Sequence, residues 1–196
     1  MVTVETAAWP NLYVDKQFLD PRICREILAE MSAAPGDAAT VYGRTASRSV
    51  DQGFRQTLRI HPSVATVELI VNRLVALQPV VEQHFDVELS ECEDPQFLHY
   101  REGDFFVAHQ DGNTGLLQLD TERRLVSTVI FLSHESDSPQ SGAHCGGSLV
   151  FTNLRTGSKF RMVGEPGMLI AFRAETTHEI TPVTHGERFS IVSWYR

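Results

Sequence analysis

The sequence predicts an α+β fold in which helices come first and a β-rich half packs against them. Apolar residues recur at helical spacing in the first part of the chain, whereas beyond residue 95 they form short runs bounded by glycines and other turn residues. A chain of 196 residues can also bury a substantial core. We therefore expect a single domain over residues 1–196, with mainly helical support at 1–95 and a β-rich core at 96–196.

Two helices are expected in the first half. Asp20 is a suitable N-cap for the first helix, and Pro35-Gly36 ends its apolar pattern. Ser63 precedes a second apolar stripe, which runs from Val64 to Leu74. Because proline lacks a backbone N–H donor, Pro79 is expected to kink or end this second helix.

The second half is expected to contain six strands, with an earlier candidate strand at Thr57–Ile60. The six are Gln96–Tyr100, Phe105–Ala108, Leu125–Ser133, Ser148–Phe151, Met168–Phe172 and Phe189–Trp194. Several short strands separated by turn residues are typical of a β-sandwich or barrel.

Composition excludes several classes of protein. The net charge is −8, with 25 acidic against 17 basic residues, so we expect no nucleic-acid partner. Apolar runs such as Leu125–Leu132 are short, and the first ten residues lack the pattern of a signal peptide, so we expect no membrane association. The three cysteines are widely spaced, as in a reducing compartment, and we expect a cytoplasmic protein.

The chemistry is indicated by the motif His-x-Asp. On a strand, residues i and i+2 face the same side, so an imidazole and a carboxylate at this spacing can reach one metal ion. With a second histidine from elsewhere, they form the two-histidine, one-carboxylate site that suits non-haem iron(II). The motif occurs twice, at His84-Phe85-Asp86 and at His109-Gln110-Asp111, and His185-Gly186-Glu187 is a carboxylate variant of it.

Local context separates these three candidates. His84 and Asp86 close the second helix, where residues i and i+2 point roughly 200° apart and cannot share an ion. His185 lies in a turn that is expected to be a connector. His109 and Asp111 follow an expected strand and precede a glycine, at the end of a strand that enters a loop. We therefore expect the site at His109 and Asp111.

At this point the sequence resembles the prolyl-4-hydroxylase family, with particular similarity to its oxygen-sensing members in the C-terminal stretch. The resemblance covers residues 96–196, about half the chain. The matching motifs, in order, are Tyr100-x-x-Gly103, His109-x-Asp111, Gly146-Gly147-Ser148-Leu149-x-Phe151, Pro166-Gly167-x-x-Ile170-x-Phe172, His178-Glu179-x-x-Pro182-Val183, Gly186-x-Arg188-x-Ser190 and Ser193-Trp194-Tyr195.

The resemblance implies a double-stranded β-helix (jelly roll) with N-terminal supporting helices. It also implies a dioxygenase that uses iron(II), 2-oxoglutarate and O2 to hydroxylate an unactivated C–H bond, with ascorbate as a candidate reductant. The iron ligands would be His109, Asp111 and His178.

The same resemblance assigns residues to the cosubstrate. Arg188 would bind the distal carboxylate of 2-oxoglutarate, since guanidinium offers a planar fork of donors. Ser190 shares a strand face with Arg188 and could donate to the same carboxylate. Tyr100 would hydrogen-bond the cosubstrate, and Thr128 is a further candidate donor.

Some features depart from the family pattern. Phe131 stands where some oxygen-sensing relatives have a cosubstrate-binding tyrosine, and the animal collagen enzymes have a lysine in place of Arg188. The segments 112–123 and 133–145 are long, and each is either a lid over the site or a tolerated insertion. His134 and His144, which flank the second segment, are expected to be exposed loop histidines.

The substrate is expected to be a peptidyl proline, with a free amino acid or another small molecule as the alternative. A non-catalytic sensor that binds 2-oxoglutarate is a second alternative, although it need not retain an intact metal-binding set. A cupin-like enzyme or sugar-binding jelly roll would leave Arg188 and Ser190 without a role, and a nucleic-acid demethylase is disfavoured by the charge. The oligomeric state is left open.

Overall fold

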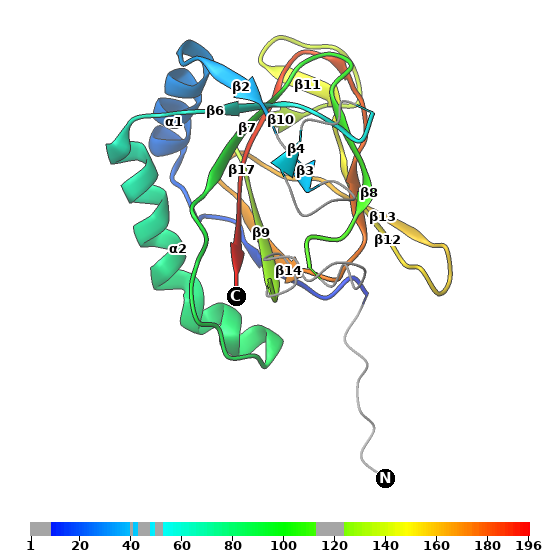
Figure 1. Cartoon of the computed structure of the whole chain (residues 1–196). Helices are drawn as coiled ribbons and strands as arrows, with labels where there is room; N and C mark the ends of the chain where they lie inside the picture. Colours follow the sequence, from blue (N-terminus) through cyan, green and yellow to red (C-terminus); the bar gives the residue numbers. More distant parts are fainter. Residues whose placement is uncertain (1–8, 40, 43–47, 50–52, 113–123) are drawn as a thin grey trace.

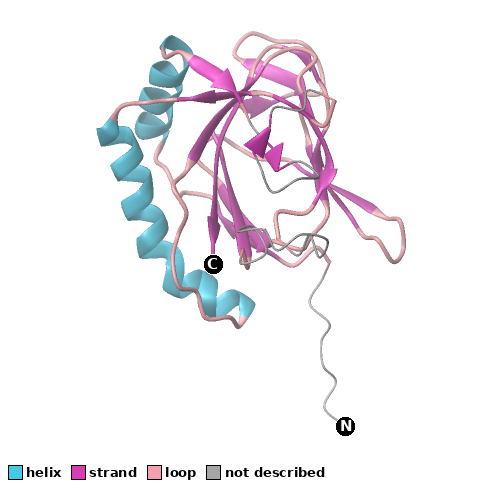
Figure 2. Ribbon diagram, viewed as in Figure 1, coloured by secondary structure: helices cyan, strands magenta, loops and turns pink. Residues whose placement is uncertain are grey.

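Two β-sheets face each other, and two helices cover the outer face of the larger sheet (Figures 1 and 2). The computed structural model describes residues 9–39, 41–42, 48–49, 53–112 and 124–196. Among these residues, every pair of neighbouring strands is antiparallel except the pair β10 and β11. The antiparallel sandwich with helices on one side confirms the expected α+β jelly roll.

The strands form two large sheets and two short ones. The larger sheet contains β1 (Leu12–Asp15), β14 (Leu169–Arg173), β9 (Val126–Phe131), β17 (Arg188–Tyr195), β7 (Gln96–Tyr100), β6 (Leu58–Ile60) and β2 (Gly36–Ala38). The smaller sheet contains β13 (Lys159–Met162), β12 (Leu149–Thr152), β15 (His178–Ile180), β8 (Phe105–His109) and β5 (Arg55–Gln56). One short sheet contains β10 (His134–Glu135), β11 (Ala143–Gly146) and β16 (Val183–His185). The other contains β3 (Val41–Tyr42) and β4 (Arg48–Ser49).

The first helix, α1, has the predicted start. It runs over Pro21–Ala33, and the side chain of Asp20 accepts hydrogen bonds from the backbone N–H groups of Arg22 and Ile23. Its buried residues, Cys24, Ile27 and Met31, recur at helical spacing and face the larger sheet.

The second helix, α2, covers Val64–Phe85 without interruption, so the helix does not end at Pro79. Pro79 lies on the exposed side, where the carbonyl that lacks its N–H partner can bond water. By length and composition this helix could cross a membrane, but the core helix of a soluble protein can meet the same test. Its buried face, which includes Leu74 and Phe85, packs against the sheet.

The hydrophobic core forms two layers, one on each face of the larger sheet. Ile130 of β9 points toward the helices and lies in one cluster with Ile70 of α2. Val129 and Phe131 of the same strand point the other way, into a cluster with Phe151 of the smaller sheet. Alternation along one strand therefore supplies both layers and decides which side chains face the interior of the sandwich.

The six expected strands are β7, β8, β9, β12, β14 and β17, with bounds that differ by at most two residues from the prediction. The N-terminal part contributes more than helices, because β1, β2 and β6 extend the larger sheet and β5 extends the smaller one. The expected division at residue 95 is therefore not a boundary in the sheets.

The segment 133–145 differs from the expected loop. It contains β10 and β11, and His144 is buried on β11, not exposed, with its Nδ1 3.0 Å from the carbonyl oxygen of Gly146. His185, expected in a connector, ends β16. The other candidate lid, 112–123, lies outside the described residues except for Gly112.

Candidate metal centre

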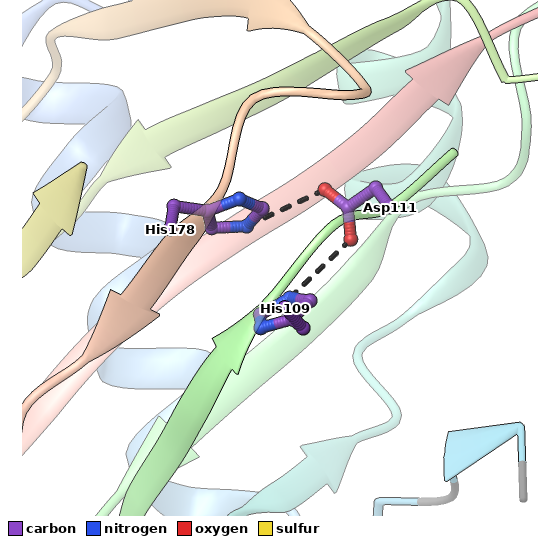
Figure 3. Close-up of side chains that lie close together, drawn as sticks. All are labelled: His109, Asp111 and His178. Atoms are coloured by element: carbon purple, nitrogen blue, oxygen red, sulfur yellow. Dashed lines mark ion pairs between the residues drawn. The ribbon is translucent and has the colours of Figure 1, made fainter. Parts of the chain in front are cut away.

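Three side chains converge between the sheets: His109, Asp111 and His178 (Figure 3). Their potential ligand atoms all lie within 4.8 Å of one another, and no other such group of three occurs among the described residues. One oxygen of Asp111 lies 3.5 Å from Nε2 of His109, and the other lies 3.5 Å from Nε2 of His178. The structure thus brings together the three residues that were expected to bind metal.

The two histidines meet because β8 and β15 pair antiparallel, with His109 opposite His178. The register shifts next to this pair, since Ile180 lies opposite Phe106. Two positions on β15 therefore match three on β8, which is the geometry of a β-bulge. The extra residue turns Phe106 to the same side as His109, and the two rings stack with centroids 3.6 Å apart.

Asp111 lies beyond the end of β8, so strand alternation does not place it. Instead, the backbone N–H groups of Asp111 and Gly112 both donate to the carbonyl of Ala174, at 2.9 and 3.0 Å. A Cβ on Gly112 would lie 2.5 Å from the carbonyl oxygen of Arg124, so this close approach requires glycine. The expected pairing of His109 with Asp111 is found, but a loop anchored to another strand produces it.

Each histidine is oriented by the backbone carbonyl two residues before it. Nδ1 of His109 lies 2.8 Å from the carbonyl oxygen of Val107, and Nδ1 of His178 lies 3.0 Å from that of Thr176. A proton on each Nδ1 satisfies these contacts and leaves the lone pair of each Nε2 directed at the shared space. This is the arrangement in which metal-binding histidines are usually held, so the donor set fits a resident metal ion.

The electrostatics also suit a cation. Burial by itself raises the pKa of Asp111, but the neighbouring imidazoles of His178 and His109 hold that pKa well below its ordinary range. Burial, followed by repulsion from His109, lowers the pKa of His178 to about 4. At neutral pH the site therefore offers a carboxylate and a neutral His178.

Arg188 faces the interior of the sandwich, opposite Tyr100 in the pairing of β17 with β7. Its guanidinium lies 5.1 Å from the centre of the Tyr100 ring, and Nη1 donates to Oγ of Ser190 at 2.8 Å. Nη2 is buried and has no hydrogen-bond partner among the described residues. Because a buried donor is costly to leave unpaired, this atom fits a carboxylate that arrives with a ligand.

Two further buried residues flank Arg188. Burial lowers the pKa of Arg188, and the neighbouring Tyr100 and Glu135 partly offset that effect. Glu135 is itself held by hydrogen bonds from Ser148 and, at 2.8 Å, from Arg161. The carboxylate of Glu135, which is paired with Arg161, thus favours the charged form of Arg188.

The expectation for Thr128 is corrected by its position. Thr128 lies on the helix-facing side of β9, and its hydroxyl donates to the carbonyl of Ser193 at 3.0 Å. The preceding residue, Ser127, faces the interior and donates to Oδ2 of Asp111 at 2.7 Å. The strand was predicted correctly, but the hydroxyl that faces the interior belongs to Ser127 and not to Thr128.

The other two candidate motifs, at His84 and at His185, form no metal-binding group among the described residues. His84 contacts Asn11, while Asp86 adopts a left-handed conformation at the C-cap of α2. His185 lies 3.6 Å from Glu102 instead of sharing a site with Glu187. Phe106 and Ser127, which were not among the expected site residues, contact His109 and Asp111, and their strand position was the only sequence signal for them.

The chain is similar to a known protein family and to several hydroxylases. The family described as the 2OG-Fe(II) oxygenase superfamily matches residues 95–196. A PKHD-type hydroxylase of Shewanella oneidensis is 29% identical over 127 residues, which are 65% of this chain and 52% of the relative. A PKHD-type hydroxylase of Paracoccus denitrificans is 32% identical over 103 residues, covering 51% of this chain and 41% of the relative. The chain therefore spans about half the length of the curated relatives it matches.

Solved structures show the same fold. A prolyl-4-hydroxylase of Pseudomonas putida has a TM-score of 0.71 at 23% identity, covering 95% of this chain and 92% of that chain. A prolyl hydroxylase of Trichoplax adhaerens, in complex with a hypoxia inducible factor peptide fragment, has a TM-score of 0.68 at 16% identity, covering 94% and 83%. At these identities the likeness concerns the fold.

The pKa of His178 predicts how the metal-free protein responds to acid. Between pH 6.5 and about 4 the unfolded chain takes up a proton on this histidine and the folded chain does not, so stability falls as the pH falls. From pH 6.5 to 4.5 the free energy of unfolding should fall by about 2–3 kcal/mol through this group, as measured by urea denaturation. In His178→Asn that part of the pH dependence should disappear. His61→Asn, at an exposed histidine, should keep it; equal slopes in wild type and His178→Asn would contradict the assignment.

Proposed function

Because the chain belongs to the 2OG-Fe(II) oxygenase superfamily, we propose that it is a dioxygenase that uses iron(II), 2-oxoglutarate and O2 to hydroxylate an unactivated C–H bond. One observation carries this proposal: His109, Asp111 and His178 converge in a chain whose interior also holds Arg188, one donor of which has no partner within the described part of the chain. In this proposal the first three residues hold the metal, and Arg188 holds the distal carboxylate of the cosubstrate.

The bound metal and cosubstrate would supply the oxidising chemistry, in which 2-oxoglutarate becomes succinate and carbon dioxide while one oxygen atom of O2 enters the product. The protein's own residues bind and orient the metal and the cosubstrate. Asp111 contributes a negative charge, and neutral His178 contributes a lone pair. The rings of Phe106 and Phe172 lie against His109 and His178 and exclude water from that side.

The remaining cosubstrate contacts are proposed for two residues. Ser190 accepts from Nη1 of Arg188, so its own proton is available to donate to the same carboxylate. Tyr100 lies across from Arg188 on the neighbouring strand and faces the same interior. Phe131, which cannot donate, is opposite Ser190 in the pairing of β17 with β9, so the contact made by a tyrosine in some relatives falls to Ser190 here.

For the substrate, we propose a peptidyl proline. Two observations support this choice: the matching fold of a prolyl-4-hydroxylase, and that of a prolyl hydroxylase solved with a peptide. A free amino acid or another small molecule is the alternative. A non-catalytic sensor is disfavoured, because it would not require three metal-binding side chains together with Arg188.

The proposed location is the cytoplasm. The three cysteines are free thiols; Cys24 is buried on α1 and Cys145 is buried on β11. Unpaired cysteines are usual in a reducing compartment.

The metal assignment can be tested with two matched variants. The protein is mixed anaerobically with iron(II) and 2-oxoglutarate, and the visible charge-transfer band is recorded before oxygen is admitted and succinate is measured. Asp111→Asn should lose the band and reduce succinate to background, because it removes the charge that balances the metal. Asp86→Asn should retain both, and asparagine also tolerates the left-handed conformation of that position. If Asp86→Asn lost the band and succinate formation while Asp111→Asn kept both, the assignment of the metal to His109 and Asp111 would be wrong.

The role of Arg188 can be separated from metal binding. In Arg188→Met, which keeps the bulk but loses the charge, the concentration of 2-oxoglutarate needed for half of the anaerobic band should rise about 10- to 100-fold, the value of a charged hydrogen bond. Arg155→Met, at an exposed turn between β12 and β13, is the control and should leave it unchanged. An unaltered requirement in the Arg188 variant would refute its role.

The substrate proposal is tested by mass spectrometry. Proline-containing peptides, free proline and other free amino acids are incubated with the wild-type protein, iron(II) and 2-oxoglutarate. We expect one added oxygen atom on a prolyl residue of a peptide, with a matching amount of succinate. Oxidation of a free amino acid while all peptides stay unchanged would favour the small-molecule alternative. Tight binding of 2-oxoglutarate without succinate would favour the sensor.

A further inference from the structure

The carboxylate of Asp111 is held from the opposite sheet. Asp111 follows β8 of the smaller sheet, whereas Ser127 lies on β9 of the larger sheet, and its hydroxyl donates to Oδ2 of Asp111 at 2.7 Å. Ser127 is 1% exposed, so water does not compete for this bond. An ionised carboxylate only accepts hydrogen bonds, so the direction of donation is fixed.

We propose that Ser127 is a positioning residue for the metal: it engages Oδ2 of Asp111 and leaves Oδ1 to bind the ion. The proposal rests on the proposed function, in which Asp111 is a metal ligand. A carboxylate held in this way occupies one coordination position instead of two. With two histidines and one carboxylate oxygen bound, the other positions stay available for cosubstrate and oxygen.

Trp194 is the partner of Ser127 in the pairing of β17 with β9, so both side chains face the interior. Its indole N–H is buried and has no hydrogen-bond partner among the described residues, whereas Ser127 makes a direct bond to Asp111.

The tryptophan is itself fixed from behind. The guanidinium of Arg124 lies 3.7 Å from the centre of the indole ring. Arg124 in turn donates two hydrogen bonds to Glu93, both at 2.6 Å. Arg124 and Glu93 thus hold the indole ring of Trp194 in place beside Ser127.

Thr128 provides an internal comparison. It is adjacent in sequence and equally buried, but its hydroxyl donates to a backbone carbonyl on the helix-facing side. If a buried hydroxyl on β9 affected metal binding only through the stability of the protein, removal of either hydroxyl would have the same effect. The proposal predicts that they differ.

The test is a titration of the metal-free protein with cobalt(II), without cosubstrate, followed by chelator competition and the visible cobalt spectrum. Ser127→Ala should weaken cobalt binding about 10- to 100-fold, as expected for loss of a residue that orients a ligand. Its spectrum should change, because both oxygens of Asp111 become available to the ion. Ser127→Thr, which restores a hydroxyl, should recover the affinity and the spectrum. Thr128→Val should bind cobalt like the wild type.

Each outcome separates this proposal from the proposed function. Failure of the wild type to bind cobalt would overturn both. Wild-type affinity and spectrum in Ser127→Ala would overturn the role of Ser127 and leave the metal site standing. Equal losses in Ser127→Ala and Thr128→Val, with no recovery in Ser127→Thr, would show a general effect on the strand and would also overturn it; thermal unfolding of each variant measures that effect directly.

Discussion

The pairing of β8 with β15 is the constraint on which the site depends. It sets His109 opposite His178, and the adjacent register shift brings Phe106 to the same side. The hydrogen bonds of two strands thereby fix the separation of two imidazoles before any ion is present. Asp111 completes the site from a loop whose backbone hydrogen-bonds to Ala174, directly after β14.

The larger sheet serves two purposes through its two faces. The face toward α1 and α2 is an apolar layer, in which Ile130 and Leu74 are completely shielded from water. The opposite face carries polar groups among apolar ones, including Ser127 and Arg188. Because adjacent residues on a strand point to opposite faces, the stabilising layer and the chemical layer come from the same strands.

Several features could be predicted because their causes are local. The N-cap at Asp20 and the apolar stripe of α2 depend on neighbours within a few residues, and both were found as expected. The continuation of α2 through Pro79 could not be predicted, since it depends on which side of the helix faces water. The burial of His144 likewise depends on the pairing of β11 with distant strands.

The sequence by itself determined the fold class, the candidate residues His109, Asp111 and His178, and the pairing of Arg188 with Ser190 on one strand face, because each is expressed in periodicity, motif order or short spacing. The tertiary structure alone decided three matters: how Asp111 reaches the histidines, that Ser127 and not Thr128 faces it, and that one donor of Arg188 finds no partner among the residues that the structure describes. These depend on strand register and loop anchoring, in which a shift of one residue reverses the direction of a side chain. That information lies in contacts between distant segments.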